Sequence, residues 1–145
     1  MTDDAAALIA KLGLAPHPEG GWYRETWREP GEGAGEGRGS ATAIYFLLER
    51  GQSSHWHRVD ASEAWLFHAG SPIALRIAPD AGGPISTIRV GPDVVAGEHP
   101  QAMVPKGWWQ AADAGEGWAL LSCVVSPAFR FEGFELAPPG WSPAP

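Results

Sequence analysis

Beyond its first twelve residues, this chain is interrupted by glycine and proline at short intervals, and this feature most constrains its fold. The 19 Gly and 14 Pro among 145 residues are about twice the usual share. The segments between them are short and rich in β-branched and aromatic residues, which favour strands separated by turns. Many short strands without an intervening helical pattern predict an antiparallel sandwich or barrel rather than an α/β fold.

Nine β-rich segments are expected to form strands in the second part of the chain. They span residues 42–48, 55–59, 63–69, 73–77, 85–90, 101–104, 108–112, 120–125 and 129–136. Residues 22–27 alternate in polarity and predict one more strand. Residues 4–12 are the only expected helix, because Leu8, Ile9 and Leu12 recur at helical spacing and Gly13 can end it.

The length of the chain fits one domain with a single core. We expect residues 1–13 to hold the N-terminal helix, 14–41 an arm and a loop, 42–137 the barrel, and 138–145 a tail. Residues 30–39 are rich in glycine and predict a flexible loop within the second of these parts.

Charge and cysteine content exclude several classes of partner. The formal net charge is −7, and the ten basic residues are scattered, which argues against nucleic acid. Cys123 has no partner for an internal disulfide, and acidic residues stand at the start where a secretory signal would place basic ones. No apolar run approaches the roughly 20 residues that cross a bilayer. We therefore expect a cytoplasmic protein that binds neither membranes nor nucleic acid.

Three side chains predict a metal-type pocket. His55 and His57 are two residues apart, and such residues point to the same face of a strand. Glu63 follows after a short turn and can close back onto them from the next strand. Two histidines and one carboxylate form the facial triad that holds first-row transition metals, here Mn, Fe, Ni or Zn. The alternatives are that the histidines lie on the surface, or that the cluster only rigidifies the barrel.

The same residues stand in a recognisable pattern. Residues 51–70 read G-x3-H-x-H-x5-E-x6-G and resemble the first cupin motif, whereas residues 105–110 read P-x-G-x2-Q and resemble the second. The second motif usually ends in a histidine that completes the metal shell, and this chain has Gln110 there. Gln110 would therefore be a weak fourth metal ligand, or would hydrogen-bond Glu63 or a bound water instead.

Further segments resemble one branch of the cupins, the Cupin_5 or DUF985 family. They are HPEGGWYRET at residues 17–26, TAIYFL at 42–47, SHWHRV at 54–59, VPKG at 104–107 and FEGFEL at 131–136. The resemblance covers nearly the whole chain. It implies a double-stranded β-helix (jelly-roll) barrel that pairs into a homodimer. Relatives of similar shape include nucleotide-sugar 3,5-epimerases and metal-dependent oxygenases.

Other side chains are candidates for contact with a small ligand. Strand alternation places Trp65 and Trp108 in the same interior as the predicted pocket, where they either line it or belong to the plain core. In the arm, Tyr23 shares a face with Glu25, opposite Arg24 and Thr26. Tyr23, Glu19 or Arg24 would touch a polar ligand, or the arm would serve the dimer.

Three functions remain open at this stage. The first is metal-assisted acid/base chemistry of the isomerase, epimerase or lyase type on a small polar metabolite such as a sugar or hydroxy acid, with Glu63 and His57 as catalytic groups. The second is the same chemistry without metal, although the chain lacks an obvious basic cradle for a nucleotide sugar. The third is a non-catalytic domain that binds a small molecule.

Overall fold

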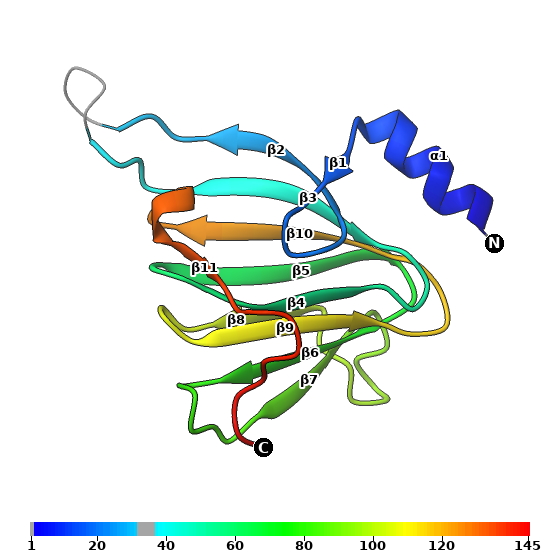
Figure 1. Ribbon diagram of the computed structural model, residues 1–145. Coiled ribbons are helices and arrows are strands. Elements are labelled where there is room, and N and C mark those ends of the chain that lie inside the picture. Colours follow the sequence, from blue (N-terminus) through cyan, green and yellow to red (C-terminus); the bar gives the residue numbers. More distant parts are fainter. Residues whose placement is uncertain (1, 32–36) are drawn as a thin grey trace.

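In the computed structural model, which describes residues 2–31 and 37–145, the strands form two antiparallel sheets (Figure 1). The first sheet has the order β1 (Ala15–Pro16), β2 (Trp22–Arg28), β3 (Thr42–Leu48), β10 (Ala119–Ser126), β5 (Ser62–Gly70) and β8 (Gln101–Val104). The second has the order β11 (Phe134–Leu136), β4 (Ser53–Val59), β9 (Trp109–Ala114), β6 (Ile73–Ala78) and β7 (Ser86–Val90). The all-β prediction is confirmed.

The helix α1 (Thr2–Leu12) lies beside β1 and β2 (Figure 1). Leu8, Ile9 and Leu12, the residues that predicted it, pack with Leu14 against Leu47 on the outer face of the first sheet. Burial of this apolar stripe stabilises a helix that would be marginal alone. Among the residues that the structure describes, no helix is long and apolar enough to span a membrane.

Most strands begin and end within two residues of the predicted positions, with two exceptions. The two-residue strand β1 was not expected and pairs with β2. Of the predicted strand 129–136, Phe134–Leu136 forms β11, whereas Phe131–Gly133 forms a 3-10 turn, η1. At this turn Gly133 lies so close to Asp60 that an added Cβ would be 2.2 Å from the carboxylate. The predicted loop 30–39 includes residues 32–36, which lie outside the described part of the chain.

The core fills the space between the two sheets. Its most buried members come from strands of both sheets: Phe46, Leu48, Trp65, Ile73, Leu75, Val90, Val104 and Leu121. Successive strand residues point to opposite faces, so this core is built from alternate positions. A second apolar cluster lies on the outer face of the second sheet, where Trp56 packs near Trp109 and Ala111.

Gly20 allows the arm to lie directly on β4. Its φ of +105° belongs to the region that glycine favours, and an added Cβ would lie 2.3 Å from the Ser53 carbonyl oxygen. This approach lets the His55 amide donate a hydrogen bond of 2.7 Å to the Glu19 carbonyl. The arm is thereby fixed against the barrel.

Replacement of Gly20 by alanine should therefore destabilise the protein more than the same change at a free glycine. Gly97 is the matched control, because its φ is +100° and an added Cβ would meet nothing within 4 Å. Gly97→Ala should lower the free energy of unfolding by about 1–2 kcal/mol through backbone strain alone. Gly20→Ala should lower it by roughly a further 1–3 kcal/mol from the clash. Urea unfolding measures both, and equal losses would show that the close approach is not required.

Candidate functional site

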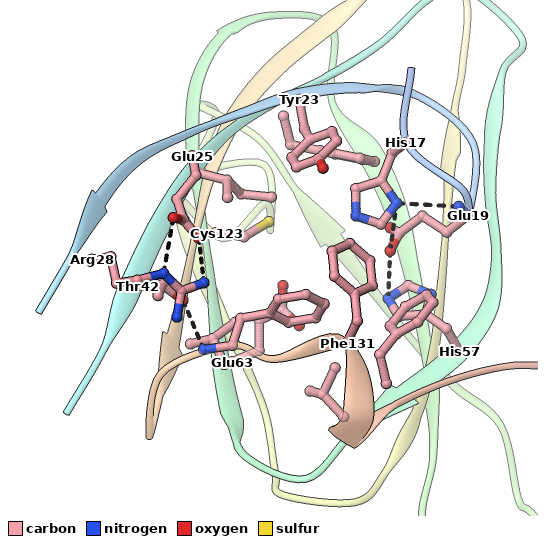
Figure 2. Close-up of a pocket in the computed structure, with 16 residues that line it drawn as sticks. His17, Glu19, Tyr23, Glu25, Arg28, Thr42, His57, Glu63, Cys123 and Phe131 are labelled. Carbon is pink, nitrogen blue, oxygen red and sulfur yellow. Dashed lines mark hydrogen bonds and ion pairs between the residues drawn. The ribbon is translucent and has the colours of Figure 1, made fainter. Parts of the chain in front are cut away.

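A cavity of about 270 Å³ lies between the two sheets, at one end of the barrel. The arm and residues 129–134 cover this end. Figure 2 shows His17, Glu19 and His57 joined on one side of the cavity and Glu25 with Arg28 on the opposite side. Its lining combines polar and apolar side chains: His17, Glu19, Tyr23, Glu25, Arg28, Thr42, Ile44, Phe46, His57, Val59, Glu63, Cys123, Val125, Phe129, Phe131 and Phe134.

A β-bulge in β4 separates the two histidines. Ser54 pairs with Ala112 and His57 with Gln110, so three steps along β4 match two along β9. His57 therefore points to the same inner side as Ser54 and lines the cavity. The His55 ring turns away from the cavity, and its Nε2 lies 2.9 Å from the Pro138 carbonyl oxygen. The prediction that the two histidines share a face is wrong, because the bulge cancels strand alternation between them.

Glu19 occupies the position beside His57 that His55 was expected to fill. Its Oε1 lies 3.3 Å from His57 Nε2 and 3.4 Å from His17 Nδ1. Ser54 Oγ donates a hydrogen bond of 2.6 Å to Glu19 Oε2. His57 Nδ1 lies 2.7 Å from the carbonyl oxygen of His55. The arm and β4 thus form one buried polar network at this side of the cavity.

Burial sets the protonation of this network. Desolvation raises the pKa of Glu19 from 4.5 to about 8, against the effect of the Ser54 hydrogen bond. Desolvation, together with the nearby charge of His57, lowers the pKa of His17 from 6.5 to about 4. Burial also lowers the pKa of His57, partly opposed by the charge of Glu63. The neutral forms of all three groups are therefore favoured near pH 7.

Glu63 is held by a chain of buried hydrogen bonds. Trp65 Nε1 donates to Gln110 Oε1 over 2.8 Å, and Gln110 Nε2 donates to Glu63 Oε1 over 2.9 Å. An indole nitrogen can only donate, so the amide oxygen of Gln110 faces Trp65 and its amide nitrogen faces Glu63. Of the two roles expected for Gln110, hydrogen bonding to Glu63 is the one that the structure shows.

Burial raises the pKa of Glu63 from 4.5 to about 7. The charge of His57 lowers this pKa, that of Glu19 raises it, and hydrogen bonds from Gln110 and Cys123 lower it. Burial and the carboxylates raise the pKa of the Cys123 thiol well above its usual range. Cys123 is therefore a neutral hydrogen-bond donor and not a nucleophile at neutral pH.

Residues 129–134, which contain three phenylalanines, cover the mouth of the cavity, and ion pairs to Asp60 fix this segment in place. Phe129, Phe131 and Phe134 pack edge to face, and Phe131 is 53% exposed. Asp60 accepts hydrogen bonds from Arg38 over 2.7 and 3.2 Å and from Arg130 over 3.0 Å. The two arginines hold the pKa of the Asp60 carboxyl below its usual range. This cluster ties the loop before β3 to the segment that leads into η1.

The predicted ligand-contacting residues divide between cavity and core. Glu19 and Tyr23 line the cavity. Trp65 is buried in the core and Trp108 packs against it, and neither reaches the cavity wall. Arg24 lies on the exposed side of β2 and donates to the Leu12 carbonyl over 2.9 Å.

His17 is a cavity residue that motif spacing did not single out. The signal available in the sequence was a histidine and a glutamate either side of Pro18, directly before two glycines. Such turns place polar side chains by close backbone approach, and no strand or helix periodicity reveals where they point.

The predicted metal ligands do not converge. His55 points away from the cavity, and Gln110 Oε1 already accepts the Trp65 hydrogen bond. Among the described residues, no group of three or more His, Cys, Asp or Glu side chains is placed to hold a metal ion. The residues present therefore do not fit the Mn, Fe, Ni or Zn ion that the motif predicted.

Two facing antiparallel sheets around a small cavity with polar and apolar walls define a jelly-roll barrel of the cupin class. A family model described as Cupin_5, Cupin superfamily (DUF985), matches residues 6–137. The chain belongs to this family, which confirms the resemblance seen in its motifs. The homodimer that the resemblance implies stays a prediction.

Similar proteins share the fold over most of this chain. The crystal structure of protein SO0799 from Shewanella oneidensis is 40% identical, with a TM-score of 0.83, and the match covers 92% of this chain and 84% of that one. The uncharacterized protein YML079W from Saccharomyces cerevisiae is 30% identical over 144 residues, 86% of this chain and 71% of the yeast protein. Oxalate decarboxylase from Bacillus subtilis is 18% identical, with a TM-score of 0.62 over 83% of this chain and 29% of its own, which is a likeness of fold alone.

Trp65→Phe should lower the free energy of unfolding by about 1–3 kcal/mol, because the buried Gln110 oxygen loses its donor. Trp22→Phe is the matched control. It removes a 3.0 Å hydrogen bond to Glu49, whose carboxylate is only partly buried and can be hydrated instead. Chemical unfolding of both variants measures the difference. A loss at Trp65 no larger than that at Trp22 would contradict the assigned amide orientation.

Glu63 should titrate near neutral pH. Its pKa in the folded chain is about 7 against 4.5 ordinarily, so the native state binds more protons between these values. Its contribution to stability is therefore complete below about pH 4.5 and falls as the pH rises through 7. Infrared difference spectra of wild type against Glu63→Gln should show a protonated carboxyl band that disappears near pH 7. Absence of this band at about pH 5.5 would contradict the raised pKa.

Proposed function

We propose that this protein is a metal-independent acid/base enzyme of the isomerase or epimerase type, acting on a small uncharged polar molecule. The observation that carries the proposal is the environment of Glu63. This buried carboxyl group lines the cavity, and its side-chain hydrogen-bond partners both donate to it. Glu63 is the proton-accepting group, and the buried network around His57 lies in the same cavity.

The partners of Glu63 suit a general base. Gln110 Nε2 donates to it, and so does the Cys123 thiol. Donors stabilise the carboxylate, whereas burial opposes it, and the balance leaves the pKa of Glu63 at about 7. A base with a pKa near the working pH combines a substantial ionised fraction with a strong tendency to take a proton.

The cavity walls favour a small neutral ligand. Its volume of about 270 Å³ accommodates a compact metabolite such as a monosaccharide, not a nucleotide sugar. Arg28 is the only arginine or lysine among the described lining residues, and it is bound to Glu25 over 2.7 and 3.0 Å. A diphosphate would therefore find no free cation. The phenylalanines of the mouth offer apolar faces for the carbon skeleton.

The oxalate decarboxylase of similar fold has Mn(II) centres, whereas the cavity of this chain is lined by Glu63, which accepts a hydrogen bond from Gln110. The proposal therefore differs from metal-assisted chemistry in a measurable way. Chelation should leave the rate unchanged, and His55→Ala should leave it within a few fold, because His55 lies outside the cavity.

The test is proton exchange with solvent. Aldoses and ketoses are incubated with the protein in D₂O, and NMR measures deuterium incorporation at carbon. At least one compound should exchange, and Glu63→Gln should lower its rate about 10²–10⁴-fold. Glu98→Gln, which breaks an ion pair with Arg89 away from the cavity, is the control.

Two results would overturn this proposal. If ligands bind with Glu63-dependent affinity but none exchanges, the cavity is a binding site without catalysis. If exchange is abolished by chelation and restored by Mn, Fe, Ni or Zn, the chemistry is metal-assisted.

A further inference from the structure

Glu19 is a second buried carboxyl group that lines the cavity, in addition to Glu63. Its side chain is 8% exposed and lies beside two imidazole rings, those of His57 and His17 (Figure 2). Ser54 Oγ donates to its other oxygen, Oε2, over 2.6 Å. The hydrogen-bond partners of these rings determine where the protons must lie.

The tautomer of His57 follows from its backbone partner. Nδ1 lies 2.7 Å from the His55 carbonyl oxygen, which can only accept, so Nδ1 carries a hydrogen. In the neutral ring, Nε2 then has a lone pair, and this atom lies 3.3 Å from Glu19 Oε1. Two lone pairs facing each other in a buried site are unfavourable unless a proton lies between them.

His17 presents the same requirement. The backbone amide of Glu19 donates to His17 Nδ1 over 3.1 Å, so Nδ1 is an acceptor and the neutral ring carries its hydrogen on Nε2. Glu19 Oε1 lies 3.4 Å from that acceptor nitrogen. An ionised Glu19 would therefore face acceptor nitrogens from both rings.

We propose that Glu19 is held as a neutral carboxylic acid whose Oε1–H donates to His57 Nε2, and that it is the proton donor of the cavity. This assignment makes Glu19 and Glu63 a pair with opposite roles. Glu63 is surrounded by donors, Gln110 and Cys123, which stabilise its carboxylate. Glu19 is surrounded by acceptor nitrogens on the side of Oε1, which stabilise its protonated form.

The catalytic consequence rests on the proposed function. Glu63 removes a proton from a substrate carbon, while Glu19 transfers its Oε1 proton to the adjacent carbonyl oxygen, which gives a neutral enediol. Return of the proton from Glu63 to carbon, and of a hydroxyl proton to Glu19, completes the isomerisation with both carboxyl groups restored. Protons are conserved, and no external oxidant or reductant is required.

The proton positions can be tested without any substrate. Long-range ¹H–¹⁵N spectra of the protein labelled in its five histidines distinguish the two neutral tautomers from imidazolium. Replacing each histidine singly by asparagine assigns the signals. Near neutral pH, His57 should be neutral with hydrogen on Nδ1, and His17 should be neutral with hydrogen on Nε2. The titratable groups that face Glu19 are His17, His57, Glu63 and Cys123, so the spectra are repeated in Glu63→Gln.

Glu19→Gln provides a second, independent measurement. Its amide nitrogen can donate to His57 Nε2 as the acid does, so both tautomers and the fold should be retained. The protonated carboxyl band of Glu19 should be present in wild type near neutral pH and absent in this variant. An imidazolium at His57 paired with ionised Glu19, or hydrogen on His57 Nε2, would overturn the assignment.

The activity measurement separates this inference from the proposed function. With a substrate that exchanges, Glu19→Gln should lower kcat about 10²-fold or more with little change in KM. Ser54→Ala, which removes only a hydrogen bond to Oε2, should reduce it far less. If the tautomers are as assigned but no compound exchanges, the proposed function fails while the acid form of Glu19 stands. If exchange occurs and Glu19→Gln leaves kcat unchanged, Glu19 is not the donor.

Discussion

Between Ser54 and His57, β4 carries three steps of chain where β9 carries two, and the geometry of the site depends on this mismatch. The bulge turns His55 out of the barrel and leaves His57 inside. In the bulge, the His55 amide donates a hydrogen bond to the Glu19 carbonyl, and this bond fixes the arm to β4. Gly20 makes this docking possible, because only a residue without a Cβ fits against Ser53. Because of this bulge, the carboxyl group of Glu19 lies beside His57 where the imidazole of His55 was expected.

Two buried carboxyl groups in one small cavity would ordinarily both be neutral. Burial raises the pKa of Glu19 to about 8 and of Glu63 to about 7, so it affects both alike. Their hydrogen-bond partners make the difference, since Glu63 meets donors and Glu19 meets the acceptor nitrogens of two histidines. Separation of two like groups by environment is the pattern by which enzymes obtain an acid and a base from the same residue type.

Gln110 shows how a cupin scaffold can carry a different chemistry at the same position. A histidine there would offer a lone pair to a metal. The amide instead uses its oxygen to accept from Trp65 and its nitrogen to donate to Glu63. Every buried side-chain polar atom of the described residues has a hydrogen-bond partner, so the network is complete without an ion. The fold is shared with an oxalate decarboxylase that has Mn(II) centres, whereas Glu63, Gln110 and Trp65 of this chain are joined by hydrogen bonds.

The sequence by itself determined the all-β fold, the N-terminal helix, most strand positions and the family, because glycine and proline punctuation and residue alternation act locally. It also identified Glu63, His57 and Glu19 as residues of interest. Only the tertiary structure decided that His55 points outward, that Gln110 is a donor to Glu63, and that His17 joins the cavity. The orientation of His55 depends on the bulge in β4, and that of Gln110 on the hydrogen bond from the Trp65 indole. The position of His17 depends on the close backbone approach of the arm to β4. Strand periodicity assumes an unbroken ladder and considers one strand at a time, so it predicts neither a bulge nor a contact between distant segments.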